Sequence, residues 1–187
     1  GFAFHGARVY AAVEQGGMLR SDDSGETWRL VEGTDGIPRA PRDAAMIHPD
    51  VHSVAIHRSS PDLVAAPTGG GFYVSHDGGA SWRLRYRCYC RALRFDPNQP
   101  QHMILGPADG VDREGRIEET TDGGATWTRR MDGLEQSWPH HMVERFVQVD
   151  DMLLAVLSNG DLITAELRSL TWTLVAAAGG NVNAVAA

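Results

Sequence analysis

Short runs in which apolar and polar positions alternate recur along the whole chain, and Gly, Pro, Asp and Ser residues separate them. A period of two is typical of strands that bury one face, and the separating residues favour turns. The runs form groups of four, which predicts a repeated unit of four antiparallel strands, A to D. In the second unit these strands are expected at residues 52–57, 63–66, 71–75 and 81–85.

Two further units repeat this arrangement, and the first unit departs from it. In the third unit the strands are expected at residues 91–95, 102–105, 116–120 and 126–130, and in the fourth at 145–149, 152–157, 161–165 and 171–175. The first unit shows strands B, C and D at residues 8–13, 17–21 and 27–31, and we interpret its strand A as absent. The repeats therefore cover about residues 1–31, 52–86, 91–131 and 145–176 of a single domain or a fragment of one. A last apolar alternation at residues 182–187 is expected to supply the missing strand and close the sheet edge.

An octapeptide marks the turn between strands C and D. Its copies are SDDSGETW (21–28), SHDGGASW (75–82) and TTDGGATW (120–127), and a degraded fourth copy ends at Trp172. Successive tryptophans lie 54, 45 and 45 positions apart, from 28 to 82, to 127 and to 172. Periods of about 40 to 50 residues built from strands are typical of propeller blades.

Turn geometry explains each residue of the octapeptide. The Asp carboxylate accepts hydrogen bonds from nearby backbone N–H groups, and the Gly takes a positive φ. The Trp begins the next strand and offers a large apolar face for packing between blades. We therefore interpret the recurring residues as structural and not catalytic: Asp23, Gly25, Trp28, Asp77, Gly79, Trp82, Asp122, Gly124 and Trp127.

The pattern Ser/Thr-x-Asp-x-Gly-x-x-Trp resembles the Asp-box, or BNR repeat, of sialidases, sortilin-type receptors, photosystem assembly factors and uncharacterised glycosyl hydrolase-like bacterial propellers. Segments such as PTGGGFYVSHDGGASW (67–82) look most like the last group. The resemblance implies an all-β fold, a β-propeller of four-stranded antiparallel blades with Asp-box hairpins. In those families the Asp-box lies on an outer hairpin away from the active site, so it indicates fold more than function.

The chain has room for about four blades, and two arrangements stay open. Either four blades close alone, or the chain is part of a larger ring completed by further sequence or by a second copy. Propellers usually have more than four blades, which favours the larger ring and makes a homo-oligomer one way to complete it.

Composition narrows the classes of partner. The 187 residues carry a net charge of −7 and no cluster of Lys and Arg, which argues against nucleic acid and anionic membrane surfaces as partners. No apolar run is long enough to span a bilayer, and no signal peptide is visible. We expect a cytoplasmic protein without a cofactor.

In an antiparallel blade the D to A and B to C loops share one face of the ring, where we expect a ligand site. The alternation of the A strands places His52, Arg91, Arg145 and Asn183 at one equivalent position near the axis. Together with Asp112, Arg113 and His141 above them, these residues are expected to bind an anionic or polyhydroxylated small molecule. The alternative is that they line the channel and pair with one another.

A metal site is the weaker possibility. His48, His52, Cys88 and Cys90 are suitable ligand types on this face, but their spacing matches no established metal motif, so we predict none.

The sialidase resemblance implies an arginine triad, a tyrosine nucleophile assisted by a glutamate, and an acidic residue. Arg91 and Arg145 match two of the arginines in type, Tyr89 the phenol, and Glu144 and Asp112 the carboxylates, whereas the family's Arg-Ile-Pro motif is absent. The competing hypothesis is a non-catalytic module that binds a glycan, a small molecule or a protein partner. We favour binding on the loop face, with exo-sialidase-like glycoside hydrolysis as the alternative.

Overall fold

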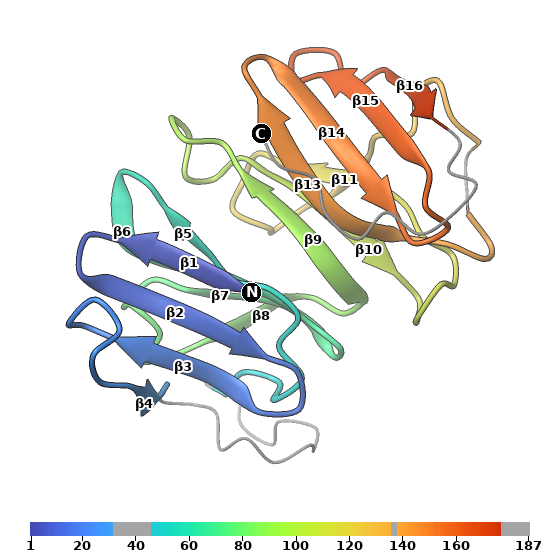
Figure 1. The fold of residues 1–187 in the computed structure, drawn as a ribbon. Coiled ribbons are helices and arrows are strands. Elements are labelled where there is room, and N and C mark those ends of the chain that lie inside the picture. Colours follow the sequence, from blue (N-terminus) through green and yellow to red (C-terminus); the bar gives the residue numbers. More distant parts are fainter. Residues whose placement is uncertain (32–45, 136–137, 177–187) are drawn as a thin grey trace.

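The chain forms four antiparallel sheets, each of four strands in the order A to D (Figure 1). The computed structural model describes residues 1–31, 46–135 and 138–176, and these residues contain sixteen strands and no helix. Within the same residues, therefore, no helix is available to cross a membrane. The architecture is all-β, with about four blades in this chain.

The first two blades comprise the following strands. Blade 1 has β1 (Phe2–His5), β2 (Arg8–Val13), β3 (Gly17–Ser21) and β4 (Arg29–Leu30). Blade 2 has β5 (Ala55–His57), β6 (Ser60–Thr68), β7 (Gly71–Ser75) and β8 (Arg83–Tyr86).

The other two blades repeat the order. Blade 3 has β9 (Tyr89–Phe95), β10 (Met103–Ala108), β11 (Glu118–Thr120) and β12 (Thr128–Arg129). Blade 4 has β13 (Val143–Val149), β14 (Met152–Leu157), β15 (Leu162–Glu166) and β16 (Trp172–Ala176).

The prediction that the first blade lacks strand A is wrong. Strand β1 pairs with β2 from Phe2 opposite Ala11 to His5 opposite Arg8, and Gly6 takes a φ of 58° in the turn between them. A turn this short leaves no polar gap in the sequence, so strands A and B look like one run. Strand β1 therefore takes the strand A position that was expected for residues 182–187, and that segment lies outside the described residues.

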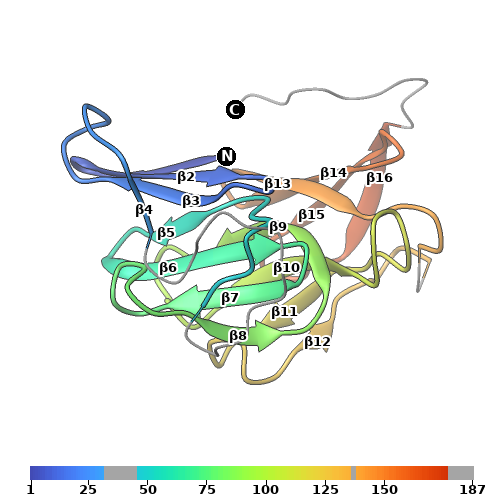
Figure 2. The ribbon, with the colours of Figure 1, turned by 90° about the horizontal axis from the view of Figure 1, so that it is seen from below.

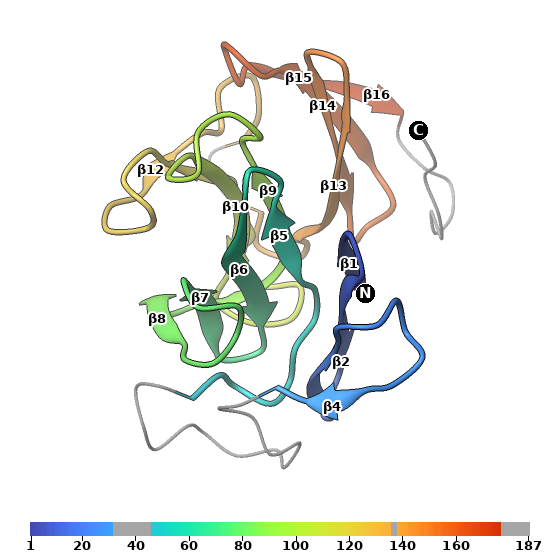
Figure 3. The same cartoon turned by 90° about the vertical axis from the view of Figure 1, so that its left-hand side faces the viewer.

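The innermost strands β1, β5, β9 and β13 follow one another around a common centre, and the sheets succeed each other in chain order (Figures 2 and 3). Apolar layers fill the space between neighbouring blades. One cluster joins blades 1 and 2 around Tyr10, Val64 and Trp82, a second joins blades 2 and 3 around Phe72 and Met103. A third cluster joins blades 3 and 4. The propeller is thus held together blade by blade.

The Asp-box hairpins share one set of hydrogen bonds. In the first copy the Ser21 hydroxyl donates to Asp23 at 2.6 Å and accepts from the Gly25 N–H at 2.8 Å, while the Thr27 N–H donates to Asp23 at 2.9 Å. The other two full copies repeat these contacts. The three glycines have φ values of 96°, 90° and 86°, as the turn interpretation requires.

The Asp-box tryptophans of blades 2 and 3 pack against the blade that precedes them. Trp82 is 1% exposed, in the cluster with Tyr10 and Val31 of blade 1, and Trp127 stacks on Tyr86 of blade 2. Trp28 belongs to blade 1, where no earlier blade of this chain covers it, and it is 40% exposed.

The two faces of the molecule carry different connections. On one face the A to B turns bond to the Asp-box hairpins of the same blade: the Gly78 N–H donates to the Asp62 carbonyl and the Gly123 N–H to the Gln101 carbonyl. On the other face the D to A and B to C loops meet, as where the Ser158 N–H donates to the Met142 carbonyl. We call these the Asp-box face and the loop face.

Candidate functional site

A central cavity of about 350 Å³ lies among the innermost strands, and residues from all four blades line it. Its polar wall comes from the B to C turn of blade 1 and from the beginnings of the A strands of the other blades. The polar side chains are those of Glu14, His52, Ser53, Arg91, Glu144 and Arg145. The cavity therefore opens toward the loop face.

Three of the four residues aligned from the sequence meet in this wall. His52, Arg91 and Arg145 all line the cavity, from blades 2, 3 and 4. The fourth, Asn183, lies outside the described residues.

Arg91 is the centre of a small polar cluster. Its Nη1 donates to both carboxylate oxygens of Glu144 on blade 4, at 3.1 and 2.9 Å. Its Nε and Nη2 donate to the Tyr89 hydroxyl oxygen at 3.1 and 2.9 Å. Burial by itself lowers the pKa of Arg91, but the bonds to Tyr89 and Glu144 outweigh it and raise the pKa above its ordinary value. Arg91 is thus a permanent cation that ties blade 3 to blade 4.

Arg145 is the free cation of the cavity. It is exposed, and it makes no hydrogen bond or ion pair with any residue that the structure describes. A ligand anion would meet no internal competitor at Arg145, whereas at Arg91 it would share the guanidinium with Glu144.

His52 is a wall residue with both ring nitrogens engaged. Its side chain is 3% exposed, its Nδ1 lies 2.8 Å from the Cys90 carbonyl oxygen, and its Nε2 lies 3.2 Å from Asp50. The ring also packs on Tyr89, with centroids 4.8 Å apart. His52 therefore shapes the cavity and leaves no ring nitrogen free for a ligand.

The structure does not bring Asp112, Arg113 and His141 into the cavity wall. Asp112 and Arg113 are exposed in the B to C loop of blade 3, where Arg113 donates to the Asp109 carbonyl at 2.7 Å. His141 stacks on Trp138 at 5.0 Å, and burial lowers its pKa. All three lie on the loop face, beside the cavity and not in it.

The residues considered as metal ligands do not converge. Among residues 1–31, 46–135 and 138–176, no three His, Cys, Asp or Glu side chains form a group that could hold a metal ion. Cys88 and Cys90 are free thiols, and burial raises the pKa of Cys90 well above its ordinary value. Burial also lowers the pKa of His48, the remaining candidate.

The chemistry of the cavity favours binding over nucleophilic attack. Burial raises the pKa of Tyr89, and Arg91 only partly offsets that effect, so the phenol keeps its proton at neutral pH. Glu144 is held by two bonds from Arg91 and not by a bond to Tyr89. The cavity offers a free cation, a paired cation and carboxylate oxygens, a set that can bind anions and hydroxyl groups.

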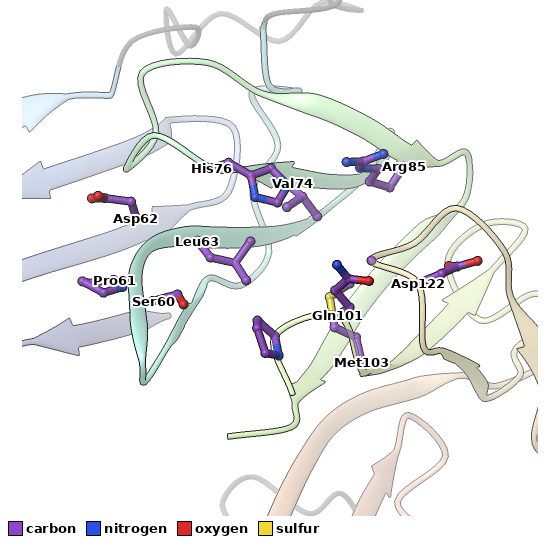
Figure 4. Close-up of a pocket in the computed structure, with 12 residues that line it drawn as sticks. Ser60, Pro61, Asp62, Leu63, Val74, His76, Arg85, Gln101, Met103 and Asp122 are labelled. Carbon is purple, nitrogen blue, oxygen red and sulfur yellow. The ribbon is translucent and has the colours of Figure 1, made fainter. Parts of the chain in front are cut away.

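The sequence pattern missed a second cavity, of about 410 Å³, between blades 2 and 3 on the Asp-box face (Figure 4). Its lining includes Leu63, Val74, Arg85 and Met103. The sequence holds a sign of it, because blade 1 carries the larger Tyr10 and Arg20 at the positions that Ala65 and Val74 take in blade 2. This difference in residue size can be recognised only after the strands of the two blades have been aligned in space.

A family model for the BNR/Asp-box repeat matches residues 73–84, the C to D hairpin of blade 2. This match identifies an Asp-box repeat in a chain of four successive four-stranded sheets. The chain is a β-propeller that carries Asp-box hairpins. No curated protein matches it significantly.

Solved structures with the same fold resemble this Asp-box propeller over nearly its whole length. An ancestral GH74 enzyme has a TM-score of 0.74 at 17% identity, covering 95% of this chain and 24% of its own. A GH74 xyloglucanase from Xanthomonas campestris has a TM-score of 0.67 at 17% identity, covering 92% of this chain and 28% of its own. YCF48 bound to D1 peptide has a TM-score of 0.62 at 17% identity, covering 92% of this chain and 52% of its own.

At these identities the likeness shows the fold alone. The Asp-box propeller spans about a quarter of the two GH74 chains and about half of YCF48.

Proposed function

We propose that the chain binds an acidic saccharide, or a similar carboxylate-bearing polyhydroxylated molecule, in the central cavity without cleaving it. The observation that carries this proposal is the exposed guanidinium of Arg145, unpaired among the described residues, beside the Arg91–Glu144 pair. A carboxylate pairs with Arg145, and ring hydroxyls have the oxygens of Glu144 as acceptors.

Size and shape support a ligand of this class. A cavity of about 350 Å³ lies at the small end of the range that holds small molecules. Its wall combines the polar groups with the apolar side chains of Val54, Leu93 and Phe146, against which the faces of a sugar ring can pack.

Isothermal titration calorimetry tests the proposal with three probes: N-acetylneuraminic acid, oligogalacturonates and neutral xyloglucan oligosaccharides. We expect the acidic probes to bind, and Arg145→Gln to weaken their binding about tenfold, which corresponds to about 1.4 kcal/mol. Arg58→Gln is the matched control, since Arg58 is exposed in the A to B turn of blade 2 on the Asp-box face. Equal affinity for acidic and neutral probes, or equal losses in both variants, would contradict the proposal.

Glycoside hydrolysis is the second candidate, and the structural likeness to GH74 enzymes favours it. Two carboxylates, Glu14 and Glu144, line the same cavity from blades 1 and 4, whereas Asp112 does not. A screen with chromogenic glycosides tests this candidate. If the chain is a hydrolase, Glu144→Gln removes activity and Asp112→Asn retains it; no turnover by the unmodified chain leaves binding as the function.

A further inference from the structure

The three grooves between neighbouring blades on the Asp-box face can be compared position by position. Strand register supplies the equivalence. The first residues of the three Asp-boxes are Ser21, Ser75 and Thr120, and they pair with Val9, Val64 and Met103 on the B strands. The next residue of each B strand is then Tyr10, Ala65 or Ile104. Opposite these on the C strands stand Arg20, Val74 and Glu119.

The first groove, between blades 1 and 2, is filled by the protein itself. The Tyr10 hydroxyl donates to the Gly78 carbonyl at 2.6 Å, and Arg20 donates to the same oxygen at 2.7 Å. Arg8 reaches across to Asp62 at 2.8 Å. An aromatic ring and two cations thus bond blade 1 to the Asp-box hairpin and the A to B turn of blade 2.

The third groove, between blades 3 and 4, holds a neutralised cluster. Arg130 pairs with Glu119 at 2.7 Å, and His102 lies 2.7 Å from Glu119 and 3.0 Å from Asp96. Every charge in this cluster has a partner inside the chain.

The second groove, between blades 2 and 3, is the exception. Ala65 and Val74 replace Tyr10 and Arg20, and although Met103 takes the place of Val64, a cavity of about 410 Å³ is left. Its apolar wall is formed by Leu63, Val74 and Met103, which are 7%, 2% and 1% exposed (Figure 4).

Two polar groups in this cavity lack the partners that their equivalents have. Arg85 occupies the position of Arg130, but Val74 stands where Glu119 would pair with it, and the buried Arg85 Nε has no hydrogen-bond partner among the described residues. The Gly123 carbonyl is equivalent to that of Gly78, yet none of the described residues donates to it. The lining of the cavity therefore includes a cationic donor from blade 2 and a carbonyl acceptor from blade 3.

The acidic residues of the wall do not neutralise Arg85. Asp62 pairs with Arg8 at 2.8 Å, and the Asp122 oxygens accept from Thr120 and Thr126 of their own Asp-box. Gln101, which replaces Asp62 at the equivalent turn, brings an uncharged amide to the rim.

We propose that this second groove is a binding site for a hydroxyaryl carboxylate. The aromatic ring lies against Leu63, Val74 and Met103, which form the apolar wall of the cavity. The carboxylate pairs with Arg85 and the phenolic hydroxyl donates to the Gly123 carbonyl, so both unpartnered groups are satisfied by one ligand. The site is separate from the central cavity, and the proposal does not depend on the function proposed for the central cavity.

Ligand-observed NMR titration with para-hydroxyphenylacetate, phenylacetate and tyramine tests each contact. We expect the first to bind best, because phenylacetate lacks the hydroxyl donor and tyramine lacks the carboxylate. Arg85→Gln should weaken binding of para-hydroxyphenylacetate at least tenfold, whereas Arg83→Gln, an exposed position on the same strand outside the cavity, should leave it unchanged.

A second variant tests the site by filling it and not by removing a charge. Ala65→Tyr restores the residue found in the first groove and should block the ligand while the folded far-ultraviolet spectrum is kept. Absence of binding by the unmodified chain, or binding that survives both Arg85→Gln and Ala65→Tyr, would overturn the proposal.

The same chemistry occurs at the end of a polypeptide that terminates in tyrosine. Gly-Gly-Tyr with a free carboxylate separates the two sources when it is compared with para-hydroxyphenylacetate. Tighter binding of the tripeptide identifies a protein chain end as the occupant, and tighter binding of the free acid identifies a small molecule.

Discussion

Blades 1 and 2 carry the same hairpin in different surroundings. Their Asp-boxes make the same hydrogen bonds, and in both the indole N–H donates to the hairpin glycine carbonyl, at 3.0 Å for Trp28 and 3.1 Å for Trp82. Yet Trp82 is 1% exposed and Trp28 is 40% exposed. The hairpin is thus a local structure that forms in either setting, whereas burial of its tryptophan requires a preceding blade.

The outer sheet face of blade 1 shows the same contrast between exposed residues in blade 1 and more buried equivalents in blade 2. Phe2 and Phe4 on β1 are 64% and 70% exposed, whereas Val54 and Ile56, at the equivalent positions of blade 2, pack into the layer against blade 1. Stability of the chain is therefore expected to reside in the layers between blades and not in the repeated motif.

The largest difference in unfolding free energy between equivalent variants of the two blades is expected at their tryptophans. Trp82→Ala should lower the free energy of unfolding by about 3 to 5 kcal/mol, because it leaves a cavity in the layer between blades 1 and 2. Trp28→Ala should cost about 1 kcal/mol or less, because no blade of this chain covers that ring. Urea denaturation followed by circular dichroism measures both, and equal losses would refute the comparison.

The Asp-box carboxylates should instead behave alike in the two blades. Asp23→Asn and Asp77→Asn each remove a carboxylate that accepts the same bonds, so they should shift the urea midpoint by similar amounts, smaller than the shift from Trp82→Ala. A much larger shift for Asp77→Asn would mean that the hairpin depends on its neighbours.

Acid titration should reveal how much the Asp-box carboxylates contribute to the stability of the fold. Hydrogen bonds from Ser21 and Thr27 lower the pKa of Asp23 to about 2, and bonds from Ser81 and Ser75 outweigh burial to lower that of Asp77. A depressed pKa stabilises the fold above the unfolded value of about 3.9, and this stabilisation is lost as the pH falls through the folded value. Between about pH 4 and pH 2 the unmodified chain should therefore lose more stability than Asp23→Asn, as acid titration in fixed urea would show.

The smallest effect on stability is expected at the exposed phenylalanines. Phe2→Ser together with Phe4→Ser should change the free energy of unfolding by less than about 0.5 kcal/mol, since both rings are exposed. We propose that this face takes part in self-association that completes a ring, so the double variant should weaken concentration-dependent dimerisation in sedimentation velocity. A chain that stays monomeric at every concentration would rule this out.

The sequence predicted what is local or periodic. The φ values of Gly25, Gly79 and Gly124 follow from the octapeptide alone, and alternation of the A strands was enough to bring His52, Arg91 and Arg145 to one cavity. Strand β1 was missed because a turn of two residues, Gly6 and Ala7, separates it from β2.

Contacts between blades could not be read in the same way. The pairing of Arg91 with Glu144 joins positions 53 residues apart, and neither motif nor period relates them. The unpartnered state of Arg85 depends on which residue faces it across the sheet and which blade follows, so it emerges only from packing.

The Asp-box tryptophans make the packing between blades asymmetric, because each covered indole lies against the preceding blade. Trp82, Trp127 and Trp172 each rest on the blade before them, so loss of blade 4 would remove Trp172 together with its own strand and leave Trp82 and Trp127 covered. Loss of blade 1 would strip the cover from Trp82 and from the blade 2 side of the first layer. Loss of either terminal blade would therefore expose apolar residues of its neighbour, but only loss of the amino-terminal blade would also uncover an Asp-box indole.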